Sequence, residues 1–321
     1  MKKIIINTQH FSYPVTIANS YLDQLLKLLE KWDLVKSLFL VIDENVARYH
    51  LQDIQSAISD YKGKFSYTLL PSGERVKSYT NLKKIHDRLL NYNIGRDTTL
   101  IAIGGGVTGD LAGYAAATYM RGLQLVHIPT TLLAMIDSAI GGKTGINFKG
   151  KKNIIGAFYQ PRLVFIDTVF LSTLPQREFN SALGELLKYG FISNKEFYNY
   201  VTENIEKIKS ADKRTIQNAI IESLQIKAGI VEQDEFEQLG LRKILNFGHT
   251  FAHAIESTLG FRIKHGEAVT AGIICALFLS NRLGILTSEK LNKFLLLPQK
   301  IGIPRIIKNV ESQSVTKQKI F

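Results

Sequence analysis

Residues 99–110 read TLIAIGGGVTGD, a run of strand-forming apolar residues that passes through three glycines into a helical pattern. Glycines at such a turn let a ligand approach the backbone, and the start of the following helix offers N–H groups to a pyrophosphate. The spacing differs from the G-x-G-x-x-G fingerprint of dinucleotide-binding proteins. The residues alone predict a dinucleotide or phosphate site, or simply a tight strand-to-helix turn, and they leave both open.

Up to about Asp167, short strand patterns alternate with amphipathic helical stretches such as residues 79–91. This alternation is typical of an α/β domain with a mostly parallel, Rossmann-like sheet. The strands are predicted from apolar or β-branched runs at residues 38–42, 65–70, 98–103, 123–128 and 163–166.

Beyond Leu174 and Pro175, strand patterns become scarce and helical periodicity dominates, which predicts an all-α second domain. Its helices are expected over residues 178–189, 213–231, 245–259 and 267–283. The first domain then covers residues 1–173 and the second residues 174–321. Because no low-complexity linker separates them, we expect the active site in the interdomain cleft.

The formal charge of +12 and the pI near 9.5 fit either a nucleic-acid surface or an enzyme with an anionic substrate. The lysines are scattered, and no helix-turn-helix, RNP or zinc-finger spacing is present, which favours the anionic substrate. The lone cysteine, Cys275, excludes an internal disulfide and fits a reducing cytoplasm. It lies in the apolar run 268–280, which is too short to span a bilayer, so we expect a buried helix there with Cys275 in the protein core. The N-terminus has no signal-peptide pattern, so we expect neither export nor a membrane anchor.

The Gly-Gly-Lys-Thr stretch at residues 141–144 is similar to part of a P-loop. A Walker A motif also needs a glycine five positions before the Gly-Lys-Thr run at residues 142–144, and Asp137 holds that place, so we reject a P-loop. Small residues beside Asp137 and Lys143 suggest a charged lining for a polar ligand. A flexible surface loop is the alternative.

Histidines cluster in the helical half of the chain. His249 and His253 are four residues apart and so share a helix face, and His265 follows from the next element. Three of the seven histidines within seventeen residues indicate a metal or acid–base site, and spacing alone would pair His249 with His253 on one ion. A zincin-type protease is excluded because Thr250 occupies the place of its glutamate.

Several stretches together resemble the 3-dehydroquinate synthase family. They are residues 104–110, 121–122, 129–147, 152–158 and 245–250, and the resemblance covers nearly all of residues 1–300. It implies the fold that these synthases share with other sugar-phosphate cyclases and with iron-type alcohol and glycerol dehydrogenases. It also implies that the first domain binds NAD and that the second binds metal and substrate.

The resemblance implies zinc, or cobalt, held by Glu185, His249 and His265, with His253 as an acid–base group beside the metal. Three protein ligands leave positions open for vicinal substrate oxygens. The catalytic residues would be Lys143, Lys188, Glu237 and His253. The substrate would contact Arg121, Asp137, Lys143, Lys188, Lys227, Arg242, Asn246 and His265.

The NAD site implied by the resemblance lies wholly in the first domain. Its residues would approach the adenosine, a ribose and the pyrophosphate in turn. They are Asp43, Asn45, Glu74, Lys77, Gly105, Gly106, Asp110, Thr130, Thr131, Lys152, Asn153 and Thr173.

The implied reaction converts 3-deoxy-arabino-heptulosonate 7-phosphate to 3-dehydroquinate and phosphate in the shikimate pathway. It proceeds by transient NAD oxidation, phosphate elimination, re-reduction and intramolecular aldol closure, so that the enzyme is a carbon–oxygen lyase. The partners expected are the small anionic sugar phosphate and a second copy of the chain in a homodimer, with no nucleic acid and no membrane. The alternatives are a dehydrogenase or another cyclase of the same fold.

Two departures from the family pattern lie in the second domain. The segment between Glu237 and Arg242 has one residue more than the family spacing. The chain also ends at Phe321 without the Asp-Lys-Lys motif whose lysine would reach the substrate phosphate. From this short C-terminus we expect a chain that binds NAD and zinc but turns over poorly, with a non-catalytic paralogue as the limiting case.

Overall fold

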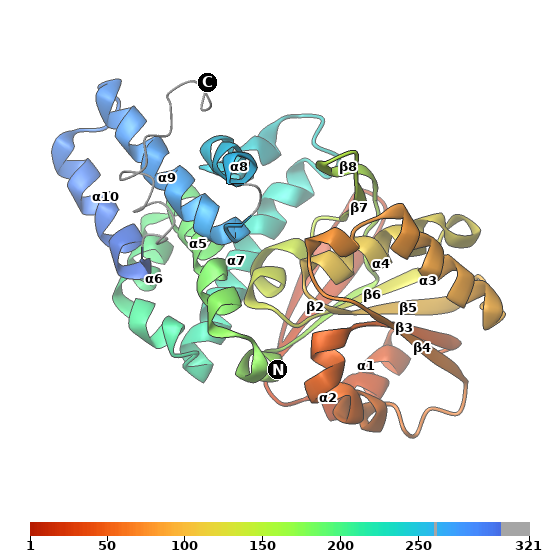
Figure 1. The fold of residues 1–321 in the computed structure, drawn as a ribbon. Coiled ribbons are helices and arrows are strands. Elements are labelled where there is room, and N and C mark those ends of the chain that lie inside the picture. The colour runs from red at the N-terminus through yellow and green to blue at the C-terminus, as the bar shows by residue number, and fades with distance from the viewer. Residues whose placement is uncertain (260–261, 303–321) are drawn as a thin grey trace. The chain divides into compact units, whose positions relative to one another are not determined.

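The computed structural model describes residues 1–259 and 262–302. The chain divides into two compact units, one from Met1 to Leu174 and a second that begins at Pro175 (Figure 1). Among the described residues, no helix combines the length and apolar character needed to cross a membrane. The expectation about the short C-terminus concerns residues 303–321, which lie outside the described part of the chain.

A seven-stranded sheet forms the first unit, and all its pairings are parallel except that of its first two strands. This confirms the predicted mostly parallel α/β domain, including all five predicted strands. The strand order is β1(Lys2–Asn7), β2(Ser12–Ala18), β9(Leu163–Asp167), β6(Gln124–Pro129), β5(Thr98–Gly104), β3(Ser37–Asp43) and β4(Lys64–Leu70).

A separate antiparallel hairpin, β7(Lys143–Phe148) and β8(Lys151–Phe158), was not predicted, and neither were β1 and β2. β1 and β8 expose most of their residues, so their sequences lack the apolar run by which the buried strands were recognised. Because Lys143 begins a strand and not a helix, the structure agrees with the rejection of a P-loop.

Helices flank the sheet, and its core packs against α3(Tyr79–Asn91) and α4(Gly106–Thr118). Fully buried Phe39, Leu100 and Leu111 belong to this core. The other helical elements of this unit are η1(Leu22–Gln24), α1(Leu25–Lys31), α2(Glu44–Ala57), η2(Glu74–Val76), η3(Tyr119–Arg121), the π-helical η4(Ala134–Ser138) and η5(Thr168–Thr173).

The order of the strands reverses between β3 and β5. From β3 the chain passes through α2 to β4 on one side, and from β5 it passes through α4 to β6 on the other. Because these strands are parallel, Asp43 at the end of β3 and Gly105 and Gly106 after β5 lie at the same edge of the sheet. Open α/β sheets bind ligands at such a switch point.

The second unit contains only helices in its described residues, as predicted for the second domain. They are α5(Gln176–Ile192), α6(Lys195–Lys209), α7(Lys213–Gln233), η6(Leu241–Asn246), α8(His249–Thr258), α9(His265–Arg282) and α10(Ser288–Ile301). The helix predicted over residues 245–259 is wrong at its start, because Gly248 adopts a left-handed φ of 81° that separates η6 from α8. Cys275 is exposed on α9, so the expectation of a core cysteine is also wrong.

Two glycines let α5 and α9 pack backbone against backbone. A Cβ on Gly184 would lie 2.0 Å from the Gly266 carbonyl oxygen, and a Cβ on Gly266 would lie 1.7 Å from the Ser181 carbonyl oxygen. Neither distance is sterically possible, so any larger residue forces the helices apart. The next residue after Gly184 is Glu185, and the residue before Gly266 is His265.

We therefore expect Gly266→Ala to destabilise the protein by at least about 2 kcal/mol, because backbone atoms cannot rotate out of the way. Gly229→Ala, on α7, is the matched control, since nothing lies within 4 Å of a Cβ placed there. It should be neutral or stabilising by up to about 1 kcal/mol, the difference in helix propensity. Urea unfolding of the two variants measures both values, and equal stabilities would contradict the argument.

Candidate metal centre

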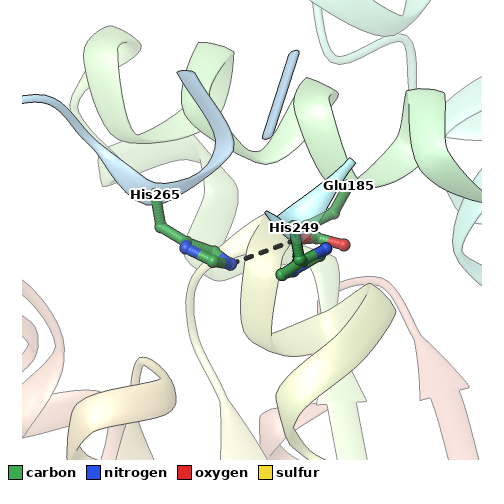
Figure 2. A group of neighbouring side chains, drawn as sticks. All are labelled: Glu185, His249 and His265. Atoms are coloured by element: carbon green, nitrogen blue, oxygen red, sulfur yellow. Dashed lines mark ion pairs between the residues drawn. The ribbon is translucent and has the colours of Figure 1, made fainter. Parts of the chain in front are cut away.

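Three side chains from three helices of the second unit converge on one point (Figure 2). α5 carries Glu185, α8 begins with His249 and α9 begins with His265. One ligand atom from each lies within 4.8 Å of the others. Among the described residues, this is the group of His, Cys, Asp and Glu side chains that could hold a metal ion.

The spacing of the ligand atoms fits tetrahedral coordination. Glu185 Oε1 lies 3.4 Å from His249 Nε2 and 3.2 Å from His265 Nε2. Ligands about 2.0–2.1 Å from a zinc ion at tetrahedral angles lie about 3.3 Å from one another. These two separations match those expected of atoms that share one ion, and the ligand atoms of the two histidines lie within 4.8 Å of each other.

The opposite ring nitrogens show which lone pairs face this point. His249 Nδ1 lies 3.3 Å from the Phe247 carbonyl oxygen, and His265 Nδ1 lies 3.4 Å from Glu256 Oε1. Both oxygens can only accept, so each Nδ1 carries a proton and each Nε2 is left as the potential ligand. Two Nε2 atoms and a carboxylate oxygen therefore face one another, an arrangement that a metal ion between them would stabilise and that a proton on His265 Nε2 stabilises in the metal-free protein.

Glu185 is an unusual carboxylate, because it has no exposed surface and neither oxygen accepts a hydrogen bond of good geometry. Its contacts are ion pairs, with the two imidazoles and with Lys188 one turn along α5. Burial acts to raise the pKa of Glu185, but Lys188 and the histidines lower it well below its ordinary value. Glu185 is therefore an anion beside two imidazole nitrogens, a donor set that fits zinc or cobalt.

His253 lies beside this group without joining it. It follows His249 by one helical turn, is exposed, and its ring centroid lies 5.5 Å from that of His249 and 6.4 Å from that of His265. The pairing of His249 with His253 on one ion, which spacing alone suggested, is not the arrangement found, because the ligand atoms within 4.8 Å of one another are those of Glu185, His249 and His265.

A loop anchored by Asp234 carries Glu237. The Asp234 carboxylate is buried and accepts hydrogen bonds from the backbone N–H groups of Leu239, Leu241 and Arg242 at 2.9–3.3 Å. Burial acts to raise its pKa, but these bonds bring the pKa below its ordinary value. Arg242 Nε lies 3.6 Å from Glu237 Oε1. The additional residue of this loop thus leaves Glu237 and Arg242 as an ion pair.

In the first unit, most of the candidate NAD residues follow the carboxyl ends of β3, β4, β5 and β6, whereas Lys152 and Asn153 lie in β8 and Thr173 ends η5. Lys77, 3% exposed, donates to Asp110 Oδ2 at 2.5 Å and also to Asn153 Oδ1. Glu74 Oε1 accepts from Asn147 Nδ2 at 2.8 Å. These bonds tie the β7–β8 hairpin to the sheet edge.

The remaining candidates at this edge are held by local hydrogen bonds. Asp43 caps α2 by accepting from Asn45 N at 2.8 Å, and Thr130 N donates to the Gly104 carbonyl at 3.0 Å. Thr131 Oγ1 caps the next turn by accepting from Ala134 N at 3.2 Å. A Cβ on Gly105 would lie 3.1 Å from Thr131, and one on Gly106 would lie 2.8 Å from Ser138 Oγ, so small residues keep the turn open.

Arg121 lies far from the candidate residues at this edge of the sheet. Arg121 is exposed, has a positive φ of 66° and precedes β6, whereas Thr130 follows it. The six residues of that strand place the two about 20 Å apart. Thr173 lies against α2, where its Oγ1 is 2.7 Å from His50 Nε2.

The other substrate candidates differ in burial. Asp137 is half-buried in η4, Lys152 is half-buried in β8, and Lys143 is exposed at the start of β7. In the second unit Lys188, Lys227 and Arg242 are buried, whereas Asn246 is exposed at the end of η6.

Sequence reasoning missed three polar residues that the structure brings into these sites. Asp234, Glu256 and His50 are buried, and each contacts a candidate residue or its loop. An acidic residue inside an otherwise apolar helical pattern was the available signal for Glu256, but it does not say which side chain it meets.

Comparison with solved structures defines the class of protein. Over its full length the chain is similar to a 2-deoxy-scyllo-inosose synthase solved with carbaglucose-6-phosphate, NAD⁺ and Co²⁺, with a TM-score of 0.89, 25% identity and 85% of that chain covered. Over 93% of its length it is similar to 2-epi-5-epi-valiolone synthase from Streptomyces hygroscopicus with NAD⁺ and Zn²⁺ bound, with a TM-score of 0.85, 26% identity and 82% of that chain covered. The fold is thus that of a class of synthases solved with NAD⁺ and a divalent metal ion.

Two family models then match in succession. The model described as 3-dehydroquinate synthase N-terminal matches residues 67–181, and the one described as 3-dehydroquinate synthase C-terminal matches residues 182–319. A 3-dehydroquinate synthase of Acetivibrio thermocellus is 40% identical over 321 residues, which are 100% of this chain and 89% of that protein. The chain belongs to the 3-dehydroquinate synthase family, as its resemblance implied.

We expect His249→Ala to abolish stoichiometric zinc binding and His253→Ala to retain it, because His249 presents a nitrogen to Glu185 at 3.4 Å and His253 does not belong to the group of ligand atoms. The two histidines share one helix and lie one turn apart, so each variant controls for the other. Metal analysis after dialysis measures the zinc content per chain. Zinc lost from His253→Ala and kept in His249→Ala would refute the assignment.

In the metal-free protein we expect His265 to keep its proton well above pH 6.5. Burial acts to lower its pKa, but Glu185 and Glu256 raise the pKa to about 10. Since 34% of the side chain is exposed, solvent screens both charges, and the observed midpoint should fall between 6.5 and about 10. The stability from this proton is complete below about pH 6.5 and is lost as the pH rises through the folded-state pKa.

NMR titration of the His265 ring measures this midpoint, and zinc must displace the same proton in order to bind. Glu185→Gln should lower the midpoint. A wild-type midpoint at or below 6.5 would show that Glu185 and Glu256 do not control the pKa of the His265 ring.

Proposed function

We propose that the chain catalyses the conversion of 3-deoxy-arabino-heptulosonate 7-phosphate to 3-dehydroquinate and phosphate. The observation that carries this proposal is the Glu185, His249 and His265 group, with ligand separations of 3.2–3.4 Å, in a chain of the 3-dehydroquinate synthase family. The reaction makes the enzyme a carbon–oxygen lyase. Its hydride is returned within each turnover, so no second redox substrate is consumed.

Zinc or cobalt would be held by Glu185, His249 and His265, and NAD by the residues at the carboxyl ends of the first unit's strands. When bound, the metal supplies a Lewis acid that acidifies a substrate hydroxyl, and NAD supplies a reversible hydride acceptor. The cyclases solved with NAD⁺ and Co²⁺ or Zn²⁺ support this pair of cofactors.

Cationic side chains of the second unit suit the anionic substrate. Lys188, Lys227 and Arg242 are each 2–6% exposed, so solvent screens their charges little. Lys188 contacts Glu185, and Arg242 contacts Glu237, so both are held in place before substrate arrives. We propose that these residues, with Asn246, bind the carboxylate and hydroxyl groups of the substrate.

Proton transfer is assigned to groups beside the metal ligands. His253 is exposed and packs against the rings of both histidine ligands, so its imidazole can hold or release a proton next to the bound hydroxyl. Glu237 is proposed to take part through its carboxylate, and Lys143 and Asp137 to contact the substrate. Arg121 stays a prediction as a substrate contact.

The homodimer and the cytoplasmic location are also proposals. The location rests on the single cysteine, which forms no internal disulfide. Light scattering coupled to size exclusion tests the dimer.

We expect phosphate release from 3-deoxy-arabino-heptulosonate 7-phosphate to require both NAD and zinc, with no net build-up of NADH. The reason is that oxidation and reduction occur on one bound cofactor. A phosphate assay and absorbance at the NADH band are recorded on the same sample. Steady growth of free NADH without phosphate would instead indicate a dehydrogenase of the same fold.

His249→Ala is the matched control in this assay, because loss of the metal should abolish phosphate release while leaving NAD binding by the first unit intact. Release that persists unchanged in this variant would contradict a metal-dependent reaction. A wild-type chain that binds NAD and zinc yet releases no phosphate would support the non-catalytic paralogue.

A further inference from the structure

Glu256 is a buried carboxylate outside the set of metal ligands. It lies on α8, seven residues after His249, and is 3% exposed. Residues seven apart lie on the same helix face two turns along, so α8 presents a ligand and a carboxylate on one side. Glu256 Oε1 lies 3.4 Å from Nδ1 of His265, which belongs to α9.

Burying a carboxylate is costly unless a cation or hydrogen-bond donor compensates it. The imidazole of His265 is such a donor, because its Nε2 is turned toward Glu185 and its Nδ1 toward Glu256. The two carboxylates thus fix the plane of the ring from both ends. A ring held this way carries its proton on Nδ1 and keeps Nε2 for a metal.

The two histidine ligands are supported differently. His249 donates to a neutral carbonyl, that of Phe247, and its side chain is 12% exposed. His265 faces a charged carboxylate, and its side chain is 34% exposed. The ligand with more contact to solvent, and so more freedom to rotate, is the one with the stronger acceptor.

We propose that Glu256 is a positioning residue that orients His265 and raises its strength as a metal ligand, so that Glu256 sets the zinc affinity of the site. This inference rests on the metal-binding part of the proposed function. Glu256 itself does not bind the ion, since its carboxylate meets the ring nitrogen on the side away from Glu185.

The test is competition for zinc with a chelator of known affinity, using the full chain. Glu256→Gln keeps the shape and one acceptor oxygen but removes the charge, and Glu256→Leu removes the acceptor at similar volume. Loss of such a partner weakens metal binding by about 10- to 100-fold. We expect about 10-fold for Glu256→Gln and a larger loss for Glu256→Leu.

Glu178→Gln is the matched control. The Glu178 carboxylate contacts Lys264, the residue next to His265. The substitution therefore removes one negative charge from the same region without changing a contact to the His265 ring. Zinc affinity should be unchanged in this variant. The absorption spectrum of the Co²⁺-loaded proteins reports ligand geometry, and it should change in the Glu256 variants alone.

Thermal unfolding of the metal-free proteins separates positioning from packing. Because Glu256 also pairs with the protonated His265 ring of the metal-free protein, we expect Glu256→Gln to lower the metal-free melting temperature slightly, to keep one cooperative unfolding transition, and to lose zinc affinity. A zinc affinity within twofold of the wild type, an equal loss in Glu178→Gln, or loss of the cooperative transition in metal-free Glu256→Gln would each overturn the proposal. If Glu256→Leu does not fold, Glu256→Gln alone decides.

A wild-type chain that binds no zinc would overturn the metal-binding part of the proposed function, and this inference with it. A wild type that binds zinc with Glu256 variants of equal affinity would overturn the inference alone. The two failures are therefore distinguishable in one set of measurements.

Discussion

The helical unit depends on the burial of one carboxylate, that of Glu185. An isolated anion with no exposed surface would be costly, so the surrounding helices must bring positive charge and metal-binding nitrogens to it. α5 provides Lys188, while α8 and α9 provide His249 and His265 at their first residues. The positions of the ligands thus depend on helix packing, because α5 and α9 approach closely at Gly184 and Gly266, which are next to Glu185 and His265.

The first unit is organised by a different constraint, the shared edge of its parallel strands. Because β3, β5 and β6 run in the same direction, the turns that follow them lie at one edge of the sheet although they are separated in the sequence. Lys77, buried at this edge, is compensated by Asp110 and Asn153, which come from a helix and from the β7–β8 hairpin. One buried cation therefore connects three elements that carry candidate NAD residues.

Much of the architecture was readable in the sequence. Residues 98–103 are apolar and strand-forming, and the glycines after them begin a helix, which is how the structure builds β5 and α4. Two predictions were wrong for local reasons. Gly248 adopts a left-handed conformation, so the helix predicted from residue 245 begins only at His249. Cys275 is exposed because the apolar run on α9 extends beyond the buried face of the helix.

The sequence by itself determined which segments become strands and helices, because periodicity and turn residues act between near neighbours. It also placed His249 and His253 on one helix face, and family resemblance added Glu185 and His265. Only the tertiary structure decided that Nε2 of His249 and Nε2 of His265 face the same Glu185 oxygen, and that Glu256 stands behind His265. The physical reason is that these contacts act through space between helices, and no spacing along the chain encodes which faces meet.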